Sequence, residues 1–233
     1  MNYHRITVGI KTGAVTAFAS DPYGNLFGLT AAHVLAGGDN QVIPQDTVRI
    51  WDNFNNWIHC GNAFAKTWLM GRLHPNDYGI IDAGLFSINF RIQQCFANSL
   101  KPLGYSPWLN ENPRRNLINR DVKGYSVSGQ ATLTPVLGKI TGVQTMYNLH
   151  GNPVGCDLVI SIKLGNTNEG DSGMLWLDTQ GNALALHFAG APGVNSITSL
   201  ATFVNRVTDS FNHLQLGWFD LSRNDVMALK TLV

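Results

Sequence analysis

Short apolar or β-branched runs alternate with turn-forming residues along most of the first ninety residues. In this part the runs are Ile6–Ile10, Ala14–Ala19, Leu26–Thr30, Val48–Trp51 and Gly79–Phe90. Glycine, proline, asparagine and aspartate separate several of them, as in Asp21–Asn25, and these residues favour tight turns. The pattern predicts an antiparallel β-meander. Only Trp57–Leu73 has no clean period, and we expect strand and loop there.

The strand rhythm loosens after this part and then resumes. The stretch Asn110–Asn116 is polar and contains Pro113, as is typical of a connection between two structural units. The later runs are Gly124–Val127, Ala131–Leu133, Val136–Val143, Leu158–Lys163, Met174–Leu177 and Ala183–Ala189. The expected units are an N-terminal β-unit over residues 1–105, a connection over 106–120 and a second β-unit over 121–197.

The period changes near the C-terminus, where apolar residues recur at spacings of three and four. They are Leu200, Phe203, Val204, Val207, Phe211 and Leu214. This spacing places them on one face of a helix, which we expect to begin near Thr198 or Ser199. A second short helix is expected from Ser222, because Asp225 follows at the spacing of a capping box. Residues 198–233 are therefore predicted to be helical.

Composition and charge exclude several classes of function. The chain has 233 residues, enough for a sizeable core, and a formal net charge of +1 without a basic run, so we expect no nucleic-acid partner. No apolar segment is long enough to span a membrane and the N-terminus lacks the pattern of an export signal, which predicts a cytoplasmic protein. Cys60, Cys95 and Cys156 match no zinc motif, so we expect buried thiols, no metal and no cofactor.

A candidate nucleophile lies in Asn168–Gly173, where Ser172 has glycines close on both sides. Glycines leave room for a substrate carbonyl and allow N–H groups to converge on one point, as an oxyanion hole requires. A serine also needs a base, and His33 follows two alanines that leave room for its imidazole. Taken alone, the serine motif also fits a tight turn and the histidine also fits a structural role.

A carboxylate that orients the imidazole would complete such a site. Asp82 opens the apolar run Asp82–Ile88, and a buried carboxylate there needs a partner such as an imidazole N–H. Asp77 is the alternative, in a segment, Asn76–Gly79, more typical of a turn. We favour Asp82.

The order of His33, Asp82 and Ser172 within two β-units resembles that of the chymotrypsin-like (trypsin-fold) serine peptidases. The matching motifs are Thr30-Ala31-Ala32-His33, Asp82-x-x-Leu85 and Gly170-Asp171-Ser172-Gly173. The resemblance covers about residues 6–208 and implies an all-β fold of two six-stranded antiparallel barrels with a C-terminal helix. It also implies that Ser172 is the nucleophile, His33 the base, Asp82 its orienting acid, and the N–H groups of Gly170 and Ser172 the oxyanion hole.

The chain departs from the animal digestive branch of this family and is more similar to the shorter bacterial and viral members. In the digestive branch a propeptide is removed, and the new N-terminal amine pairs with the acid that precedes the serine. Here Ile6–Ile10 is better assigned to the first strand than to a new N-terminus, so we expect activity without processing. Asp171 then needs another partner, or only forms hydrogen bonds within its turn.

The specificity pocket resembles that of the staphylococcal-type glutamyl endopeptidases and, less closely, that of the picornaviral main proteases. Asn166 occupies the position where the trypsin branch has an acid, so a preference for lysine or arginine is not expected. Thr167 and His187 lie where the resemblance implies a grip on a glutamate or glutamine side chain. An apolar substrate would leave their polar groups unpaired, at a cost. Alternatively, His187 is a structural histidine beside the cleft.

The sequence therefore predicts a serine endopeptidase that cleaves protein or peptide substrates through an acyl-enzyme. A second hypothesis is a binding or regulatory module that keeps the fold and whose activity is gated by a partner protein. A third is acyl chemistry on esters or thioesters, because the same site attacks any activated carbonyl.

Overall fold

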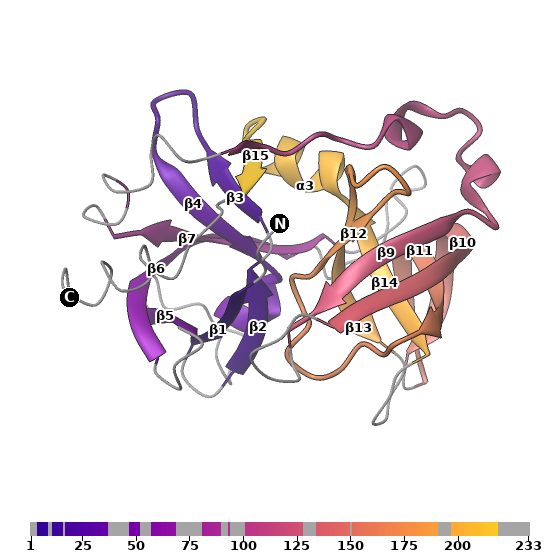
Figure 1. Cartoon of the computed structure of the whole chain (residues 1–233), viewed down its shortest axis with the longest axis horizontal. Coiled ribbons are helices and arrows are strands. Elements are labelled where there is room, and N and C mark those ends of the chain that lie inside the picture. The colour runs from indigo at the N-terminus through magenta and orange to yellow at the C-terminus, as the bar shows by residue number, and fades with distance from the viewer. Residues whose placement is uncertain are drawn as a thin grey trace.

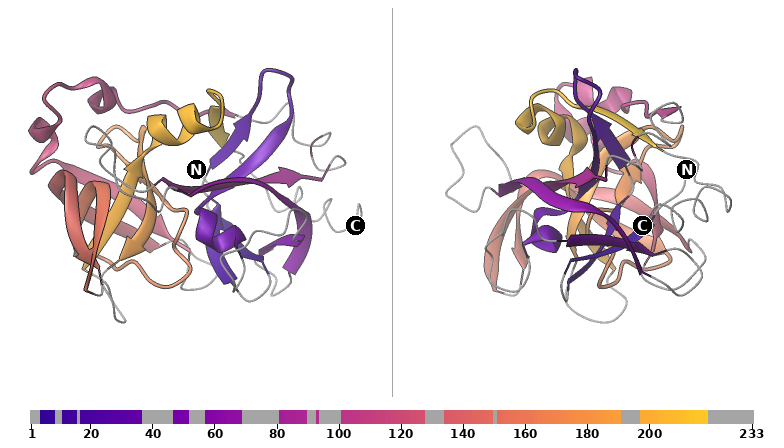
Figure 2. Two further views of the ribbon diagram at one scale, coloured as in Figure 1. Left: turned by 180° about the vertical axis from the view of Figure 1, so that it is seen from behind. Right: turned by 90° about the vertical axis from the view of Figure 1, so that its left-hand side faces the viewer.

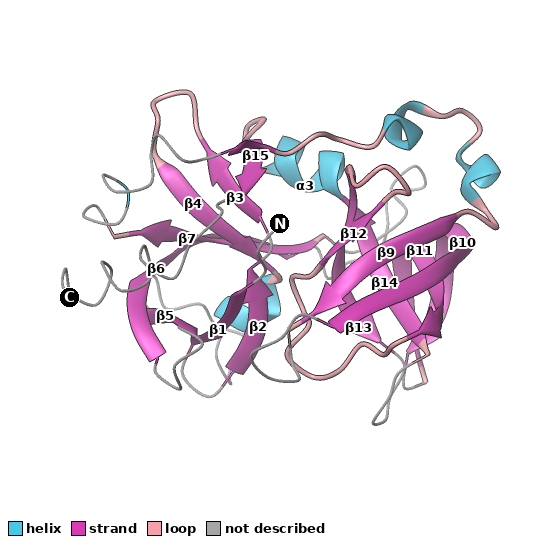
Figure 3. Cartoon of the chain, in the orientation of Figure 1, coloured by secondary structure: helices cyan, strands magenta, loops and turns pink. Residues whose placement is uncertain are grey.

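A computed structural model shows two β-units side by side, joined by a long connection that runs along one edge of both (Figures 1 and 2). The described residues are 4–8, 11–15, 17–36, 47–51, 57–68, 81–89, 93, 101–127, 134–149, 151–190 and 197–218. Strands dominate and helices are short (Figure 3). The expected all-β fold of two units is confirmed.

The N-terminal unit is a nine-stranded sheet in which all neighbouring strands are antiparallel, in the order β2-β1-β5-β6-β7-β4-β3-β15-β8. Its strands are β1 (His4–Val8), β2 (Lys11–Val15), β3 (Ala17–Ser20), β4 (Leu26–Thr30), β5 (Thr47–Trp51), β6 (Trp57–Trp68), β7 (Asp82–Ile88), β8 (Lys101–Pro102) and β15 (Gln215–Trp218). In the described residues this unit has more strands than the six expected. Two of the additional strands, β8 and the C-terminal β15, extend the sheet beyond β3.

The C-terminal unit is a closed barrel of six strands in the order β10-β11-β14-β13-β12-β9, as expected. Its strands are β9 (Asp121–Ser126), β10 (Thr134–Leu149), β11 (Asn152–Leu164), β12 (Leu175–Leu177), β13 (Ala183–Gly190) and β14 (Thr198–Phe203). Trp176 is fully buried inside it, where full burial of a large apolar side chain contributes about 2–3 kcal/mol. Gly124 and Gly138 allow the barrel wall to pack closely, since a Cβ atom would lie 2.9 Å from the Met174 methyl group at Gly124 and 2.4 Å from Ile160 at Gly138.

The expectation of a helix from Thr198 or Ser199 is wrong. Residues 198–203 form β14, which pairs with β11 and β13, and only Val204–Ser210 form a helix, α3. Because β14 lies within the barrel wall and five of its six residues are buried, its apolar residues do not alternate. Without alternation, the spacing of its apolar residues fits a helix as well as a strand.

Other helices within the described residues are α1 (Ala32–Leu35) and two single 3₁₀ turns in the connection, η1 (Pro107–Asn110) and η2 (Arg114–Leu117). α3 packs against β13 and β14 and leads into β15, so the chain returns to the first sheet after completing the second barrel (Figure 1). No helix in the described part of the chain is long and apolar enough to cross a membrane. The second helix expected from Ser222 lies outside the described residues.

Two of the three cysteines are buried free thiols, as expected. Burial raises the pKa of both Cys60 and Cys156 to about 12. A thiol with so high a pKa carries very little thiolate, so neither is suited to nucleophilic chemistry. Cys95 lies outside the described residues.

Candidate active site

The His33 and Asp82 side chains meet because their two strands are neighbours. β4 ends at Thr30 and leads into α1, which carries His33, while Asp82 is the first residue of β7. The pairing of Thr30 with Gly84 brings the end of one strand to the start of the other. Asp82 Oδ2 lies 2.6 Å from His33 Nδ1, and Asp82 Oδ1 accepts a hydrogen bond from the His33 N–H at 3.0 Å.

This arrangement fixes which ring nitrogen of His33 is free to act. The carboxylate is buried, with Asp82 only 8% exposed, and it accepts the hydrogen on Nδ1. In the neutral imidazole Nε2 is then the acceptor, which is the state that a general base requires. The competing acid, Asp77, lies outside the described residues.

Ser172 lies on the loop before β12, and this loop contacts the first unit. The Ser172 carbonyl accepts a hydrogen bond from the Ala14 N–H of β2 at 2.8 Å and lies 3.5 Å from the hydroxyl of Thr30, three residues before His33. The nucleophile candidate and the base candidate are therefore held together across the junction of the two units. Among the described residues no hydrogen bond joins the Ser172 hydroxyl to the His33 ring, and such bonds often form only when substrate binds.

Gly173 is required at this junction. Its φ of +99° is in the left-handed region that favours glycine, and a methyl group in place of its hydrogen would overlap with the Ala14 carbonyl oxygen. Its N–H donates to the His187 carbonyl at 2.9 Å, and the His187 N–H donates to the Met174 carbonyl at 2.8 Å. The serine loop is thus tied to β2 on one side and to β13 on the other.

The two N–H groups expected to form the oxyanion hole have no hydrogen-bond partner in the described part of the protein. Neither Gly170 N–H nor Ser172 N–H donates a hydrogen bond among the described residues. Gly170 has a φ of +96°, a backbone conformation that most other residues adopt only with strain. Both donors remain available to a ligand beside Ser172.

Asp171 is fully buried and receives hydrogen bonds from the end of β9. The Ser126 hydroxyl lies 2.9 and 2.7 Å from its two oxygens, and the Val127 N–H donates to Oδ1 at 2.8 Å. The Asn168 N–H donates to Oδ2 at 2.9 Å. Asp171 therefore does more than close its own turn, because it joins the serine loop to β9. Nothing in the sequence points to Ser126, because no motif relates it to Asp171, 45 positions later.

The pocket candidates Thr167 and His187 are both buried, at 2% and 3% exposure, and Asn166 is half-buried beside Thr167. The Thr167 hydroxyl has no hydrogen-bond partner in the described structure. The pKa of His187 is lowered to about 3, mainly by burial and in smaller part by the interaction with His33, while the charge of Asp82 opposes the shift. His187 therefore lies close to the His33–Asp82 pair and is uncharged at neutral pH.

Ser199 and Trp176 lie behind His187, and no motif in the sequence indicates this. His187 Nδ1 lies 2.7 Å from the Ser199 hydroxyl, which accepts a hydrogen bond from the Trp176 indole N–H at 2.8 Å. Ser199 comes from β14, the segment that the sequence suggested was helical, so no pattern could have placed it against β13.

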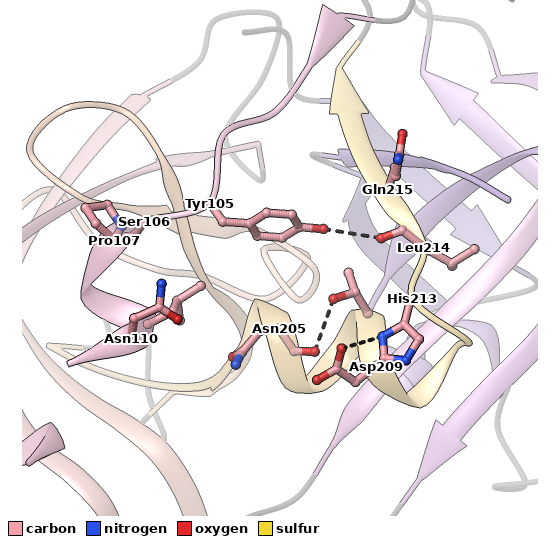
Figure 4. Close-up of a pocket in the computed structure, with 11 residues that line it drawn as sticks. Tyr105, Ser106, Pro107, Asn110, Asn205, Asp209, His213, Leu214 and Gln215 are labelled. Carbon is pink, nitrogen blue, oxygen red and sulfur yellow. Dashed lines mark hydrogen bonds and ion pairs between the residues drawn. The ribbon is translucent and has the colours of Figure 1, made fainter. Parts of the chain in front are cut away.

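A separate cavity of about 420 Å³ lies between the connection and α3 (Figure 4). Tyr105 and Asn110 line it on one side and Asn205, Asp209 and His213 on the other. It includes none of the site residues expected from the sequence. Elsewhere, no three His, Cys, Asp or Glu residues of the described segments lie together as metal ligands would.

Comparison with known proteins gives structural neighbours only. No protein-family model and no curated protein sequence matches the chain. Solved structures do match, among them Thermobifida fusca Protease A, at 16% identity and a TM-score of 0.56, covering 91% of this chain and 95% of that one. Nocardiopsis protease matches at 17% identity and a TM-score of 0.54, covering 91% and 95%. A glutamic acid specific serine protease, described as using a histidine triad in substrate binding, matches at 13% identity and a TM-score of 0.55. The match covers 91% of this chain and 97% of that one.

These neighbours are chymotrypsin-like serine proteases, and the likeness extends over nine-tenths of the chain. The resemblance expected from the three motifs is thus confirmed at the level of the fold. At such low identities a shared fold does not by itself establish a shared activity, which must be argued from the site.

Proposed function

We propose that this chain, which has the chymotrypsin-like fold, is a serine endopeptidase that works through Ser172, His33 and Asp82. The observation that carries the proposal is the buried carboxylate of Asp82, which lies 2.6 Å from His33 Nδ1. Both residues belong to the N-terminal unit, to which the Ser172 loop of the second unit is hydrogen-bonded through Ala14. A structural role for His33 alone would not explain why the Gly170 and Ser172 N–H groups are unpaired in the described structure.

In the proposed reaction His33 Nε2 takes the proton of the Ser172 hydroxyl as Oγ attacks the substrate carbonyl. The developing negative charge on the carbonyl oxygen accepts hydrogen bonds from the Gly170 and Ser172 N–H groups. The C–N bond then breaks, and the proton passes from His33 to the leaving amine. Water then attacks the acyl carbon as His33 takes its proton; the bond from the acyl carbon to Ser172 Oγ breaks, Oγ recovers the proton from His33, and the acid leaves. Asp82 stabilises the imidazolium in both halves.

The proposed substrates are proteins or peptides with glutamate or glutamine on the acyl side of the cleaved bond. Thr167 and His187 supply a buried hydroxyl and a buried imidazole near the serine loop, and the hydroxyl is unpaired in the described structure. Groups of this kind favour a side chain that forms hydrogen bonds with them. The glutamate specificity ascribed to one structural neighbour agrees with this choice.

Labelling with a fluorophosphonate probe tests the proposal. The wild-type protein is expected to be labelled, and Ser172→Ala and His33→Ala to lose labelling, since removal of a triad serine or histidine typically costs about a million-fold in turnover. Asp82→Asn should weaken labelling because it disturbs the histidine tautomer.

Asp77→Asn serves as the control and is expected to label at the wild-type rate. Weakened labelling in Asp77→Asn together with wild-type labelling in Asp82→Asn would overturn the assignment of Asp82. A folded wild type that is not labelled at all would contradict the proposed activity and favour a module gated by a partner protein.

A further inference from the structure

Three buried groups form a hydrogen-bonded chain that ends at the proposed specificity pocket. Trp176 and Ser199 are fully buried and His187 is 3% exposed. The Ser199 hydroxyl oxygen lies 2.8 Å from the indole Nε1 of Trp176 and 2.7 Å from the Nδ1 of His187. These contacts join β12, β14 and β13, and the backbone of β13 is in turn bonded to the serine loop.

The direction of the hydrogen bonds follows from the donors available. An indole N–H can only donate, so Ser199 accepts from Trp176. The serine hydroxyl has a single hydrogen, and His187 Nδ1 is its one acceptor in the described structure. If Nδ1 carried the imidazole hydrogen, a fully buried O–H would have no acceptor, which is costly. The hydrogen of the neutral imidazole is therefore on Nε2.

We propose that Ser199, held by Trp176, positions His187 as a neutral donor through Nε2, and that the pocket therefore selects the amide of glutamine over the carboxylate of glutamate. This inference rests on the proposed peptidase function and decides between the two side chains that it leaves open. Ser199 and Trp176 are positioning residues, since they act through His187.

An amide matches these groups better than a carboxylate does. The amide oxygen accepts the His187 Nε2 hydrogen, and the amide NH₂ donates to the Thr167 hydroxyl, which has no other partner in the described structure. A carboxylate would lose its hydration against a neutral imidazole, because neither the serine nor the tryptophan behind it can take up a proton. The glutamic acid specific neighbour is described instead as using three histidines.

Matched peptide substrates that differ only in glutamine or glutamate at the acyl-side position test the selectivity. The wild type is expected to cleave the glutamine peptide with a kcat/KM about tenfold to a hundredfold higher. Equal rates, or faster cleavage of the glutamate peptide, would overturn the inference. Fluorophosphonate labelling in the same samples separates this failure from loss of the proposed activity, because the probe has no side chain for the pocket.

Variants test whether Ser199 causes the selectivity. In Ser199→Ala the ratio of the two kcat/KM values is expected to fall toward one, whatever the absolute rate of probe labelling. Ser199→Ala combined with Trp176→Phe removes the stranded indole N–H and should give the same ratio if the single variant folds poorly. Ser199→Thr keeps the hydroxyl and should restore selectivity. Ser161→Ala, on the neighbouring β11, is the matched control.

The tautomer can also be measured without turnover. Proton–nitrogen correlation NMR of protein with isotopically labelled histidine shows which ring nitrogen of His187 carries hydrogen, with His187→Ala used to assign the signal. We expect hydrogen on Nε2 in the wild type and a mixture of tautomers in Ser199→Ala. A wild-type signal from hydrogen on Nδ1, or an unchanged selectivity ratio in both Ser199→Ala and the double variant with Trp176→Phe, would overturn the proposal.

Discussion

At the scale of single residues, Ser126 is the clearest case of a side chain whose role depends on a distant partner. Its hydroxyl bonds both oxygens of Asp171, the residue between the proposed oxyanion donors Gly170 and Ser172. A hydrogen bond to a buried charged group contributes about 1.5–3 kcal/mol. Because this hydrogen bond orients the loop, Ser126→Ala is expected to slow fluorophosphonate labelling by about tenfold. Ser126→Thr keeps the hydroxyl and should label at the wild-type rate.

The matched control is Ser210→Ala, which removes a hydroxyl bonded only to the Val207 carbonyl on the exposed side of α3. It should label like the wild type. Labelling of Ser126→Ala at the wild-type rate would mean that Asp171 keeps the loop in place without the Ser126 hydroxyl.

At the scale of secondary-structure elements, Asp157 of β11 stabilises the start of α3. It is fully buried, accepts from the Phe203 N–H at 2.9 Å and pairs with Arg206 Nη1 at 2.7 Å. Burial raises the pKa of Asp157, and the Arg206 charge opposes this shift. Arg206→Ala leaves a buried charge without its partner and should lower the free energy of unfolding by about 3 kcal/mol at neutral pH.

The sign of the pH dependence follows from the raised pKa. In the folded state Asp157 holds its proton to a higher pH than in the unfolded chain, so its ionisation destabilises the fold as the pH rises. Without Arg206 this pKa rises further, and the protonated acid no longer needs a cation. The loss in Arg206→Ala should therefore shrink in mildly acidic buffer, as measured by urea unfolding. Lys139→Ala, which breaks the partly exposed pair with Asp121, should cost less than about 1 kcal/mol at either pH.

At the scale of the whole molecule, the proposed site exists only where the two units touch. The contact between Gly173 and Ala14 sets how closely they approach. Gly173→Ala adds a methyl group against the Ala14 carbonyl at a positive φ, so we expect a loss of at least about 2 kcal/mol in stability together with loss of probe labelling.

Gly24→Ala separates backbone strain from the clash between units. Gly24 also has a positive φ, +85°, but open space surrounds its Cβ position. Gly24→Ala should lower the free energy of unfolding by only about 1 kcal/mol and leave probe labelling intact. Equal effects of the two substitutions, measured by thermal unfolding and labelling, would show that the contact between the units does not matter.

The local features of the protein can be predicted from its sequence. Strand rhythm and turn residues are readable because a strand places its pattern in four to eight neighbouring residues, and the all-β fold follows from them. The motifs around His33, Asp82 and Ser172 were also readable, because each places its small residues next to the reactive group. The two buried thiols, Cys60 and Cys156, agree with the expectation from spacing.

Only the tertiary structure decided which distant residues meet. Thr198–Phe203 is a strand because the barrel wall needs it between β11 and β13, and this pairing overrides a spacing that suits a helix. The same pairing brings Ser199 to His187, and the end of β9 brings Ser126 to Asp171. Hydrogen bonds between strands far apart in the chain leave no periodic trace in the sequence, so the partners of the site appear only when the barrel has closed.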